Sequence, residues 1–374
     1  MRFLSNKTQK QVTPMPDYER DNIRRMVGYT WGEQPNDEAT IKLNTNENPY
    51  PPTPDVDKAL AQLAGANLRR YPQPTADHLR DVIASKHNVE RNQVVVTNGG
   101  DEALRLAVTT YVDPQTSIAV ADPSYSLYPV LAEIHNADMV HIALDENWAL
   151  PVDFAATVNA AGANLTCLVN PHAPSGTLTP RAQLSDLAEA LNGVLLIDEA
   201  YVDFIEPDAA YESASLTQSN DNVLILRTFS KGYSLAGMRL AYLLGSKGLI
   251  DPIVNKTRDS YNIDHISQAV GLAAFNDQPY AEETWRQVRS QRQILRKALG
   301  QLGLSSPVSH ANFLLVEVPS GARFNAIEIY HTLKERGILV RHFATPRLQD
   351  KIRISIGTSE DNNRLIAILT ELLS

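Results

Sequence analysis

The chain of 374 residues is long enough for more than one domain, and its composition, 43% hydrophobic and 21% charged, is typical of a globular protein. Its net charge of −9 argues against a surface for nucleic acid or anionic membranes, because both need clusters of excess lysine and arginine. The one cysteine, Cys167, excludes an internal disulfide and lies in an apolar run, which predicts a packed thiol in a reducing compartment.

The N-terminal residues MRFLSNKTQKQVTP contain no apolar stretch of signal-peptide length, and no run elsewhere is long enough to span a bilayer. We therefore expect a soluble, cytoplasmic protein. Residues 1–45 predict a polar arm that packs on another part of the molecule. The following run LNTNENPYPPTPD is rich in asparagine and proline, which excludes a helix or a central strand there.

From about residue 77 to residue 244, short apolar runs alternate with amphipathic helical patterns. Continuous apolar strands that alternate with helices predict an α/β fold, with a mostly parallel sheet covered by helices on both faces. We assign this large domain to residues 46–278. Its predicted strands are residues 93–98, 117–122, 138–144, 165–170, 193–198, 222–226 and 239–244.

Residues 279–374 differ in style and predict a smaller α+β domain. A long, charge-rich helix is predicted at the start, and shorter strands and helices follow it. The predicted helices are residues 281–303, 324–337 and 360–373, and the predicted strands are residues 312–318, 338–343 and 351–357.

In open parallel sheets, ligands bind at the carboxyl ends of the strands, so the residues that follow each apolar run are the candidates for chemistry. The turn TNGGDEA, which contains Gly99 to Glu102, leads from a strand into a helix whose N-terminus would attract an anion. By itself this signal is weak, and an ordinary helix N-cap explains it equally well.

Two further strand exits carry polar side chains. Asp198 follows the apolar run LLI, where a carboxylate is costly unless a cation or strong donor pairs with it. A structural cap would explain Asp198, but a protonated ring nitrogen fits better, and Tyr201 offers a phenol from the same turn. Tyr125 follows Pro123 and Ser124, and it either packs in the core or lies over a flat cofactor.

The stretch RTFSKGYSLAGMR places Thr228, Ser230, Lys231 and Arg239 between two core strands. A solvated loop is one explanation. Together with the other strand exits, however, these residues match one ligand, pyridoxal 5′-phosphate. The hydroxyls, Arg239 and the Gly-Gly turn would hold its phosphate, Asp198 would pair with its ring nitrogen, and Tyr125 would stack on its ring. Lys231 would form an imine with its aldehyde. The sequence predicts no metal site, because its histidines are scattered.

At this point the chain resembles a fold-type I pyridoxal-phosphate aminotransferase, and within that class the histidinol-phosphate aminotransferases. The motifs KLNTNENPY, TNGGDEAL, DPSYSLY, IDEAYVDF, RTFSKGYSLAGMR and KIRISIGT carry the resemblance and span most of the chain. It implies catalytic roles for Lys231, Asp198 and Tyr201, the last as donor to the cofactor's ring oxygen. The other residues to which it assigns roles are Gly100, Asp101, Glu102, Tyr125, Thr228, Ser230 and Arg239 at the cofactor, Tyr50 at the cofactor of a neighbouring subunit in a homodimer, and Arg353, Arg341, Tyr29 and Tyr261 at the substrate.

The chain departs from the family pattern N-P-N-N-P-T-G at one point, where it has NPHAPSG. Ala173 stands where the family has the asparagine that bonds the ring oxygen. This leaves that oxygen to Tyr201, helped by His172 or by a water molecule.

We therefore expect an aminotransferase that moves an amino group between glutamate and imidazole-acetol phosphate, with Lys231 as the base for the proton shift. An aromatic-amino-acid aminotransferase and a threonine-phosphate decarboxylase are the alternatives that keep the cofactor. A cofactor-binding regulator lacks support, because no basic domain or helix-turn-helix is attached. The remaining alternative is a phosphate-binding α/β protein without the cofactor.

Overall fold

The structure, a computed structural model, describes residues 18–35, 37 and 39–373. The predicted absence of a signal peptide concerns residues that lie largely outside this part of the chain. Among the described residues, no helix is long and apolar enough to cross a membrane.

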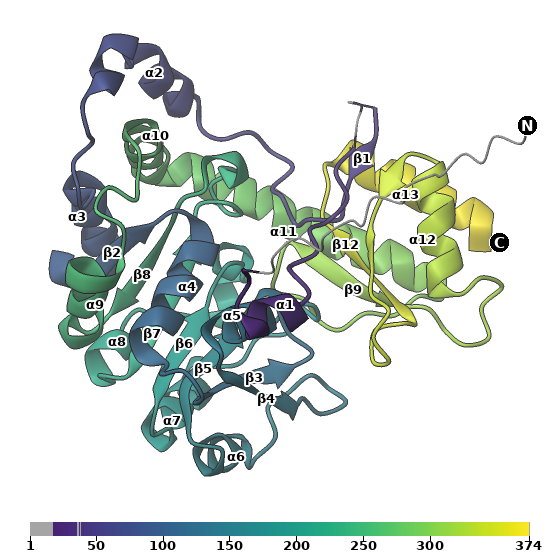
Figure 1. The fold of residues 1–374 in the computed structure, drawn as a ribbon. Coiled ribbons are helices and arrows are strands. Elements are labelled where there is room, and N and C mark those ends of the chain that lie inside the picture. Colours follow the sequence, from purple (N-terminus) through teal and green to yellow (C-terminus); the bar gives the residue numbers. More distant parts are fainter. Residues whose placement is uncertain (1–17, 36, 38, 374) are drawn as a thin grey trace, which may run out of the picture.

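A central sheet of seven strands organises the larger part of the molecule, in the order β2-β8-β7-β6-β5-β3-β4 (Figure 1). The strands from β7 to β4 run parallel, whereas β8 is antiparallel to both of its neighbours, β2 and β7. The predicted mostly parallel sheet is thus confirmed. The strands are β2 (Val94–Thr97), β3 (Ser117–Asp122), β4 (Asp138–Ala143), β5 (Ala163–Val169), β6 (Val194–Asp198), β7 (Val223–Thr228) and β8 (Ala241–Gly245).

Helices cover both faces of this sheet, and each face has its own hydrophobic cluster. Alternate residues of one strand point to opposite faces: Ile197 of β6 belongs to one cluster and Leu196 to the other. Burial on both faces explains why the strands are continuously apolar. The helices of this part are α2 (Pro54–Gln62), α3 (Asp77–His87), α4 (Gly99–Tyr111), α5 (Leu127–His135), α6 (Phe154–Ala160), α7 (Arg181–Ala190), α8 (Leu216–Ser219), α9 (Lys247–Pro252) and α10 (His265–Asn276).

The C-terminal part forms a second, smaller lobe beside the large sheet (Figure 1). Its antiparallel sheet has the order β11-β12-β9, and its helices share a third hydrophobic cluster with that sheet. The elements are α11 (Gln278–Gln301), β9 (Phe313–Glu317), α12 (Ala326–Glu335), β10 (Ile338–Leu339), β11 (Arg341–His342), β12 (Lys351–Ser355) and α13 (Ser359–Leu373).

The N-terminal residues that precede the large sheet contact both parts. Helix α1 (Asp21–Arg25) lies against α5, where Asn22 Nδ2 donates to the carbonyl of Glu133 (2.7 Å). Strand β1 (Ile41–Lys42) instead pairs in parallel with β10 of the C-terminal part. Residues assigned to the arm therefore contact both the large-sheet part and the C-terminal part. The domain boundaries at residues 45 and 278 stay a prediction.

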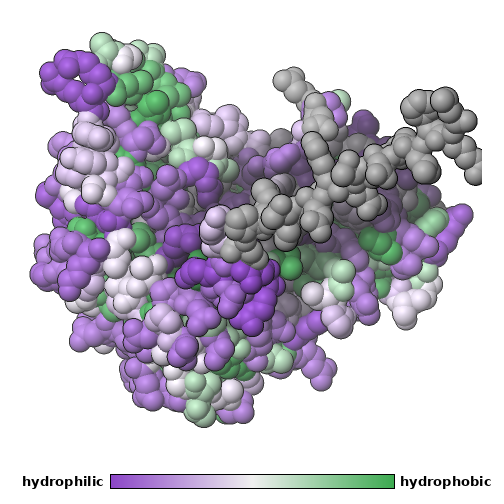
Figure 2. Space-filling view, in the orientation of Figure 1, coloured by the Kyte–Doolittle hydropathy of each residue, from purple (hydrophilic) through white to green (hydrophobic). Residues whose placement is uncertain are grey.

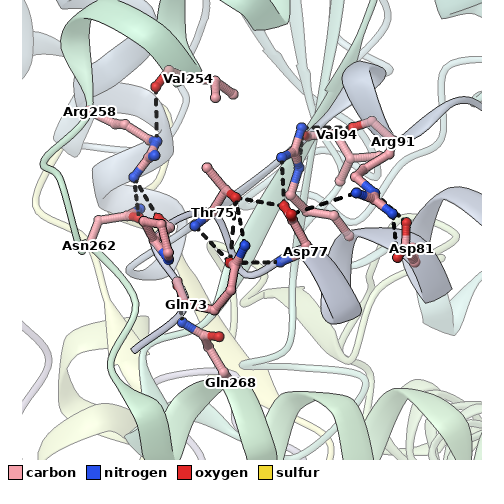
Figure 3. Close-up of polar contacts among 12 residues, drawn as sticks. Gln73, Thr75, Asp77, Asp81, Arg91, Val94, Val254, Arg258, Asn262 and Gln268 are labelled. Carbon is pink, nitrogen blue, oxygen red and sulfur yellow. Dashed lines mark hydrogen bonds and ion pairs between the residues drawn. The ribbon is translucent and has the colours of Figure 1, made fainter. Parts of the chain in front are cut away.

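The loops before α3 and before α10 are joined by side-chain hydrogen bonds (Figure 3). Arg258 Nη1 donates to the carbonyl of Pro74 (2.9 Å) and, within its own loop, to the Asn262 side chain (3.4 Å), while Gln268 Nε2, on α10, donates to the carbonyl of Gln73 (2.8 Å). These bonds fix the loop of residues 258–262, which carries Tyr261.

Candidate active site

The segments that carry the predicted site begin at one edge of the large sheet. In the register of β5, β6 and β7, Asp198 lies opposite Val169 on one side and Leu226 on the other. The backbone continues this alignment past the strand ends, because the Glu199 N–H donates to the Leu226 carbonyl (2.8 Å). The carboxyl ends of the three strands therefore present their polar residues side by side.

Lys231 lies in a turn between β7 and β8, and a side-chain hydroxyl of this turn stabilises its backbone. The Thr228 hydroxyl accepts the Ser230 N–H (3.1 Å), and both residues are buried. The Lys231 Nζ donates to the carbonyl of Thr45 (2.8 Å), which lies far away in the sequence. Burial lowers the pKa of Lys231 to about 8, and nearby Arg353 contributes in the same direction. A lysine with this pKa is about one-tenth neutral at pH 7, far more than an ordinary lysine, which favours its use as a nucleophile or base.

Asp198 is buried, with 5% of its surface exposed, and it accepts two hydrogen bonds. The Tyr128 hydroxyl donates to one carboxylate oxygen (3.0 Å), and the Ala200 N–H donates to the other (3.1 Å). Burial raises the pKa of Asp198 to about 6, although both hydrogen bonds oppose the rise. A buried carboxyl of this kind fits a cationic partner, whose charge would favour the ionised form.

The turn between β2 and α4 forms a cradle with Arg239. Gly99 has a φ of +77°, a conformation that favours glycine, and a Cβ there would lie 2.6 Å from Arg239 Nη2 and push the arginine side chain aside. Arg239 pairs with Asp101 (3.2 Å), and both side chains remain about half exposed, at 47% and 56%. Such an exposed pair is weak and can open to an incoming anion. Gly100 follows Gly99 in the first turn of α4.

Glu102 lies in the same turn, but its carboxylate has other partners. It accepts the backbone N–H of Asn98 and the Asn262 Nδ2 (2.9 Å). It thus closes the N-terminal turn of α4 and ties it to the loop that contains Tyr261.

Aromatic residues line the next part of the site. The ring of Tyr125 contacts those of Tyr29 and Tyr128 edge to face, with centroids 5.8 Å and 5.7 Å away, and its hydroxyl donates to Asp101 (3.4 Å). Tyr261 instead stacks on Tyr71 (4.5 Å between centroids), and 45% of its surface is exposed. Tyr29 is therefore beside the predicted stacking ring, whereas Tyr261 packs against another loop.

Tyr201 is held by a residue that sequence reasoning missed. Its hydroxyl accepts a hydrogen bond from Asn46 Nδ2 (3.0 Å), and its ring packs edge to face on Phe313. Burial raises the pKa of Tyr201, while Arg353 and Asn46 act in the opposite direction. The sequence marked the region around Asn46 as a turn and as part of the motif KLNTNENPY, but it gave Asn46 no role.

Arg353 and Arg341 lie directly opposite each other on the antiparallel strands β12 and β11. The Arg353 guanidinium lies 5.3 Å from the Phe313 ring centre and 5.5 Å from that of Phe343. Its Nη2 donates to the Asn44 carbonyl (3.1 Å), but its buried Nε has no hydrogen-bond partner among the described residues. Burial lowers the pKa of Arg353.

The loop with Ala173 is rigidly bonded within the protein. Ala173 is buried and offers only a methyl group. The His172 Nδ1 bonds the Ser175 hydroxyl (2.7 Å), and its Nε2 bonds the Pro123 carbonyl (2.8 Å). Both ring nitrogens of His172 are thus engaged, which disfavours His172 as the helper of Tyr201.

Tyr50 packs against the hydrophobic cluster of the C-terminal part, and its backbone N–H donates to Asn48 Oδ1 (3.1 Å). The structure thus places Tyr50 outside the group of strand-end residues just described. Tyr128, which sequence reasoning also missed, lies in the first turn of α5, and its ring contacts that of Tyr125, which precedes the helix.

The residues present fit a flat, phosphorylated cofactor. The cradle at Gly99 suits an anion, the buried carboxyl of Asp198 suits a cation, and Lys231 has the lowered pKa that suits a nucleophile. Ser124 adds a buried hydroxyl without a hydrogen-bond partner in the described part of the chain. No group of histidine, cysteine and acidic side chains that could hold a metal ion occurs among the described residues.

Residues 38–369 match the model of the family described as aminotransferase class I and II. The chain therefore belongs to this family of aminotransferases. A histidinol-phosphate aminotransferase 1 of Trichormus variabilis is 42% identical over 360 residues, which cover 96% of this chain and 100% of the relative. A histidinol-phosphate aminotransferase of Citrifermentans bemidjiense is 40% identical over 94% of this chain and 98% of that one.

Solved structures agree with this result. The histidinol-phosphate aminotransferase of Sinorhizobium meliloti, in complex with pyridoxal 5′-phosphate, has a TM-score of 0.82 and 26% identity. The alignment covers 89% of this chain and 91% of that protein. An aspartate aminotransferase of Thermus thermophilus has a TM-score of 0.79 at 20% identity and shares the fold. The predicted fold class, an α/β fold of the fold-type I aminotransferases, is thus confirmed.

Proposed function

We propose that this protein is a pyridoxal 5′-phosphate-dependent aminotransferase that moves the amino group of glutamate to imidazole-acetol phosphate, giving histidinol phosphate and 2-oxoglutarate in histidine biosynthesis. The names of relatives that match over nearly the full length of both chains support this pair of substrates. The observation that carries the proposal concerns Arg353: its buried Nε has no hydrogen-bond partner among the described residues, and the residue lies opposite Arg341 in the C-terminal sheet.

When bound, pyridoxal 5′-phosphate supplies an acceptor for the electron pair that the substrate's α-carbon releases. We assign the covalent attachment of the cofactor to Lys231, whose pKa of about 8 supports this role. Once free of the cofactor, the Lys231 Nζ would act as the base that accepts the proton from the substrate's α-carbon. Asp198 keeps the ring nitrogen protonated, which is what the buried position of its carboxyl supports.

Five further side chains complete the cofactor site in this proposal. The Tyr201 hydroxyl donates to the ring oxygen, and the Tyr125 ring lies over the cofactor. Thr228, Ser230 and Arg239, with the backbone of Gly100, Asp101 and Glu102, hold the phosphate. Arg239 Nη2 lies 3.2 Å from the Asp101 carboxylate, so the arginine is next to the α4 turn, and this proximity supports a single phosphate site formed by both.

The substrates have different anionic groups. Glutamate has carboxylates, whereas histidinol phosphate has a phosphate and no carboxylate. Arg353 offers a planar fork that suits either anion in turn, and Arg341 supplies a second cation beside it. Tyr29 and Tyr261 would contact the imidazole ring; the position of Tyr29 beside Tyr125 supports its share of this role.

The test is a single-turnover reaction of the loaded protein with histidinol phosphate, phenylalanine and tyrosine, followed by the cofactor's absorbance. We expect histidinol phosphate to react fastest. Arg341→Ala should slow it by about 10-fold or more, because a hydrogen bond to a charged group is worth about 1.5–3 kcal/mol. Arg336→Ala, which removes an exposed arginine of the same part of the molecule, is the control. Faster reaction of the aromatic acids, unchanged by Arg341→Ala, would favour an aromatic-amino-acid aminotransferase, and release of carbon dioxide from threonine phosphate would favour the decarboxylase.

We further propose a homodimer in which Tyr50 reaches the cofactor phosphate of the neighbouring subunit. Exposed apolar side chains support a contact surface: Leu60, on α2, and Leu68 and Tyr71 have 42%, 52% and 81% of their surface exposed. In Figure 2 the visible face is mostly hydrophilic, with hydrophobic atoms grouped over α2. Mixing Tyr50→Phe and Lys231→Ala subunits should restore activity, since each heterodimer contains one intact site. Subunit exchange without recovered activity would contradict the shared site.

We place the protein in the cytoplasm, with small-molecule substrates and no nucleic-acid partner. The free, buried thiol of Cys167 supports a reducing compartment. Cell fractionation checks this, and recovery from an oxidising compartment would contradict it.

A further inference from the structure

Asn46 lies between the C-terminal sheet and the candidate site, and all of its polar groups are bonded. Only 1% of its surface is exposed, and its φ of +56° is in the left-handed region, which asparagine tolerates better than most residues. Its backbone N–H donates to the Ser355 hydroxyl (2.9 Å), and its carbonyl accepts from Asn312 Nδ2 (2.9 Å). The backbone on both sides of its side chain is therefore fixed.

The direction of the hydrogen bonds fixes the orientation of the Asn46 amide. The Ser355 hydroxyl accepts the Asn46 N–H, so its own proton is free to go to Asn46 Oδ1 (3.1 Å). With Oδ1 turned to Ser355, Nδ2 is turned to the Tyr201 hydroxyl (3.0 Å). An amide nitrogen can only donate, so the Tyr201 oxygen is the acceptor.

The hydrogen bond from Asn46 leaves the Tyr201 hydroxyl free to donate its own proton. A phenol has one proton to donate. Because Tyr201 accepts from Asn46, that proton stays available for another acceptor on the site side. The donor that the loop of residues 170–176 would supply is absent, since Ala173 has no polar side chain and both nitrogens of His172 are engaged.

We infer that Asn46 is a positioning residue that directs the Tyr201 proton to the cofactor's ring oxygen and so offsets the missing polar group at Ala173. This inference rests on the proposed function, in which Tyr201 donates to that oxygen. Asn46 acts only through Tyr201. It also links Tyr201 to β12, because Ser355 lies two residues after Arg353 on the same face of that strand.

The experiment measures the pH midpoint of the cofactor's visible absorbance in the loaded protein. A donor to the ring oxygen stabilises its negative charge and lowers the affinity of the neighbouring nitrogen for a proton, so loss of the donor raises the midpoint. Tyr201→Phe should raise it by about one to two pH units, because such a bond is worth about 1.5–3 kcal/mol and one unit corresponds to about 1.4 kcal/mol. Asn46→Ala should raise it by about half a unit or more. Added to Tyr201→Phe, it should have little further effect.

Asn48→Ala is the matched control in the same segment. Its amide contacts the Gly232 carbonyl and the Thr284 hydroxyl (3.4 Å each), so the midpoint should stay where it is. If Asn46→Ala fails to fold, Asn46→Asp replaces it as a variant of nearly the same shape whose ionised side chain accepts instead of donating. We expect it to raise the midpoint in the parent and much less in the Tyr201→Phe protein.

The outcomes separate the inference from the function on which it rests. A midpoint that moves with Tyr201→Phe but not with Asn46→Ala or Asn46→Asp overturns the inference and leaves the role of Tyr201 intact. Equal shifts from the Asn46 variants with and without the Tyr201 hydroxyl also overturn it, because Asn46 would then act by another route. A midpoint unmoved by Tyr201→Phe contradicts the proposed role of Tyr201 itself.

Discussion

The two sides of the candidate site differ in how their charged groups are satisfied. On the side of the large sheet, Asp198 accepts from Tyr128 and Ala200, and Lys231 donates to the Thr45 carbonyl. On the side of the C-terminal sheet, Arg353 is partly buried, and its buried Nε has no partner among the described residues. On the first side, which we call the fixed side, Asp198 and Lys231 have hydrogen-bond partners within the protein. On the second, which we call the exchangeable side, one donor has no partner among the described residues.

This difference suits the two kinds of ligand in the proposed reaction. A cofactor that stays in place benefits from side chains whose positions are fixed before it binds. A substrate that comes and goes needs a cation that can exchange partners, and an unpaired buried donor gives the incoming anion a favourable bond. The register of β11 and β12 places Arg341 opposite Arg353, so two cations lie side by side on the substrate side.

The largest effect on turnover is expected at the fixed side, from Asp198→Asn. The amide can occupy the same space but cannot hold the ring nitrogen protonated, so kcat should fall by about 10²–10³, the typical loss when one preorganised electrostatic partner is removed. Asp122→Asn is the control, because Asp122 is an exposed carboxylate at the end of β3 in the same sheet. Steady-state kinetics measures both, and near-normal turnover of Asp198→Asn would contradict its role.

The second prediction concerns stability at the fixed side. Burial lowers the pKa of His172 to about 4, below its ordinary value of 6.5, and the positive charge of Arg347 acts in the same direction. The unfolded chain therefore binds the proton more readily, and stability is lost as the pH falls from about 6.5 to about 4. The loss from this group should approach about 3 kcal/mol, at about 1.4 kcal/mol per unit.

Denaturant unfolding of the parent and His172→Gln proteins at pH 7 and pH 4.5 checks this. The difference between the two pH values should be smaller in the variant, whatever its stability at pH 7. Equal pH dependence of the two proteins would show that His172 is not held in its neutral form.

The smallest effect is expected at the exchangeable side, from Arg353→Lys. Lysine keeps the charge but loses the planar fork, so KM for glutamate should rise by about 10-fold to 100-fold, as loss of a charged hydrogen bond of about 1.5–3 kcal/mol predicts. The pH midpoint of the cofactor's absorbance should move little. Arg336→Lys, on the surface of the same part, is the control. A variant with unchanged KM would remove Arg353 from the substrate site.

The sequence allowed prediction of those features that depend on local pattern. Continuous apolar runs identified the strands of the large sheet, and the position of Asp198 and Lys231 after such runs brought them to one edge. Each of these results depends on neighbours that are close in the chain or on a rule for parallel sheets.

Contacts between distant segments could not be predicted in the same way. Asn46 and Tyr201 are 155 positions apart, and Tyr128 and Asp198 are 70 apart. Their hydrogen bonds depend on how segments that are distant in the sequence pack together. An asparagine in a proline-rich run indicates only a turn. The antiparallel direction of β8 and the pairing of β1 with β10 likewise depend on packing rather than on local pattern.

The most direct test of the account is to find the lysine that binds the cofactor. The protein loaded with pyridoxal 5′-phosphate is reduced with borohydride and digested, and the labelled peptide is identified by mass spectrometry. We predict a single adduct on Lys231, and its loss in Lys231→Ala. Lys42 is the internal comparison, because its side chain is also partly buried and its charge is close enough to lower the pKa of Lys231. An adduct on Lys42 or another lysine, or no adduct at all, would contradict the account.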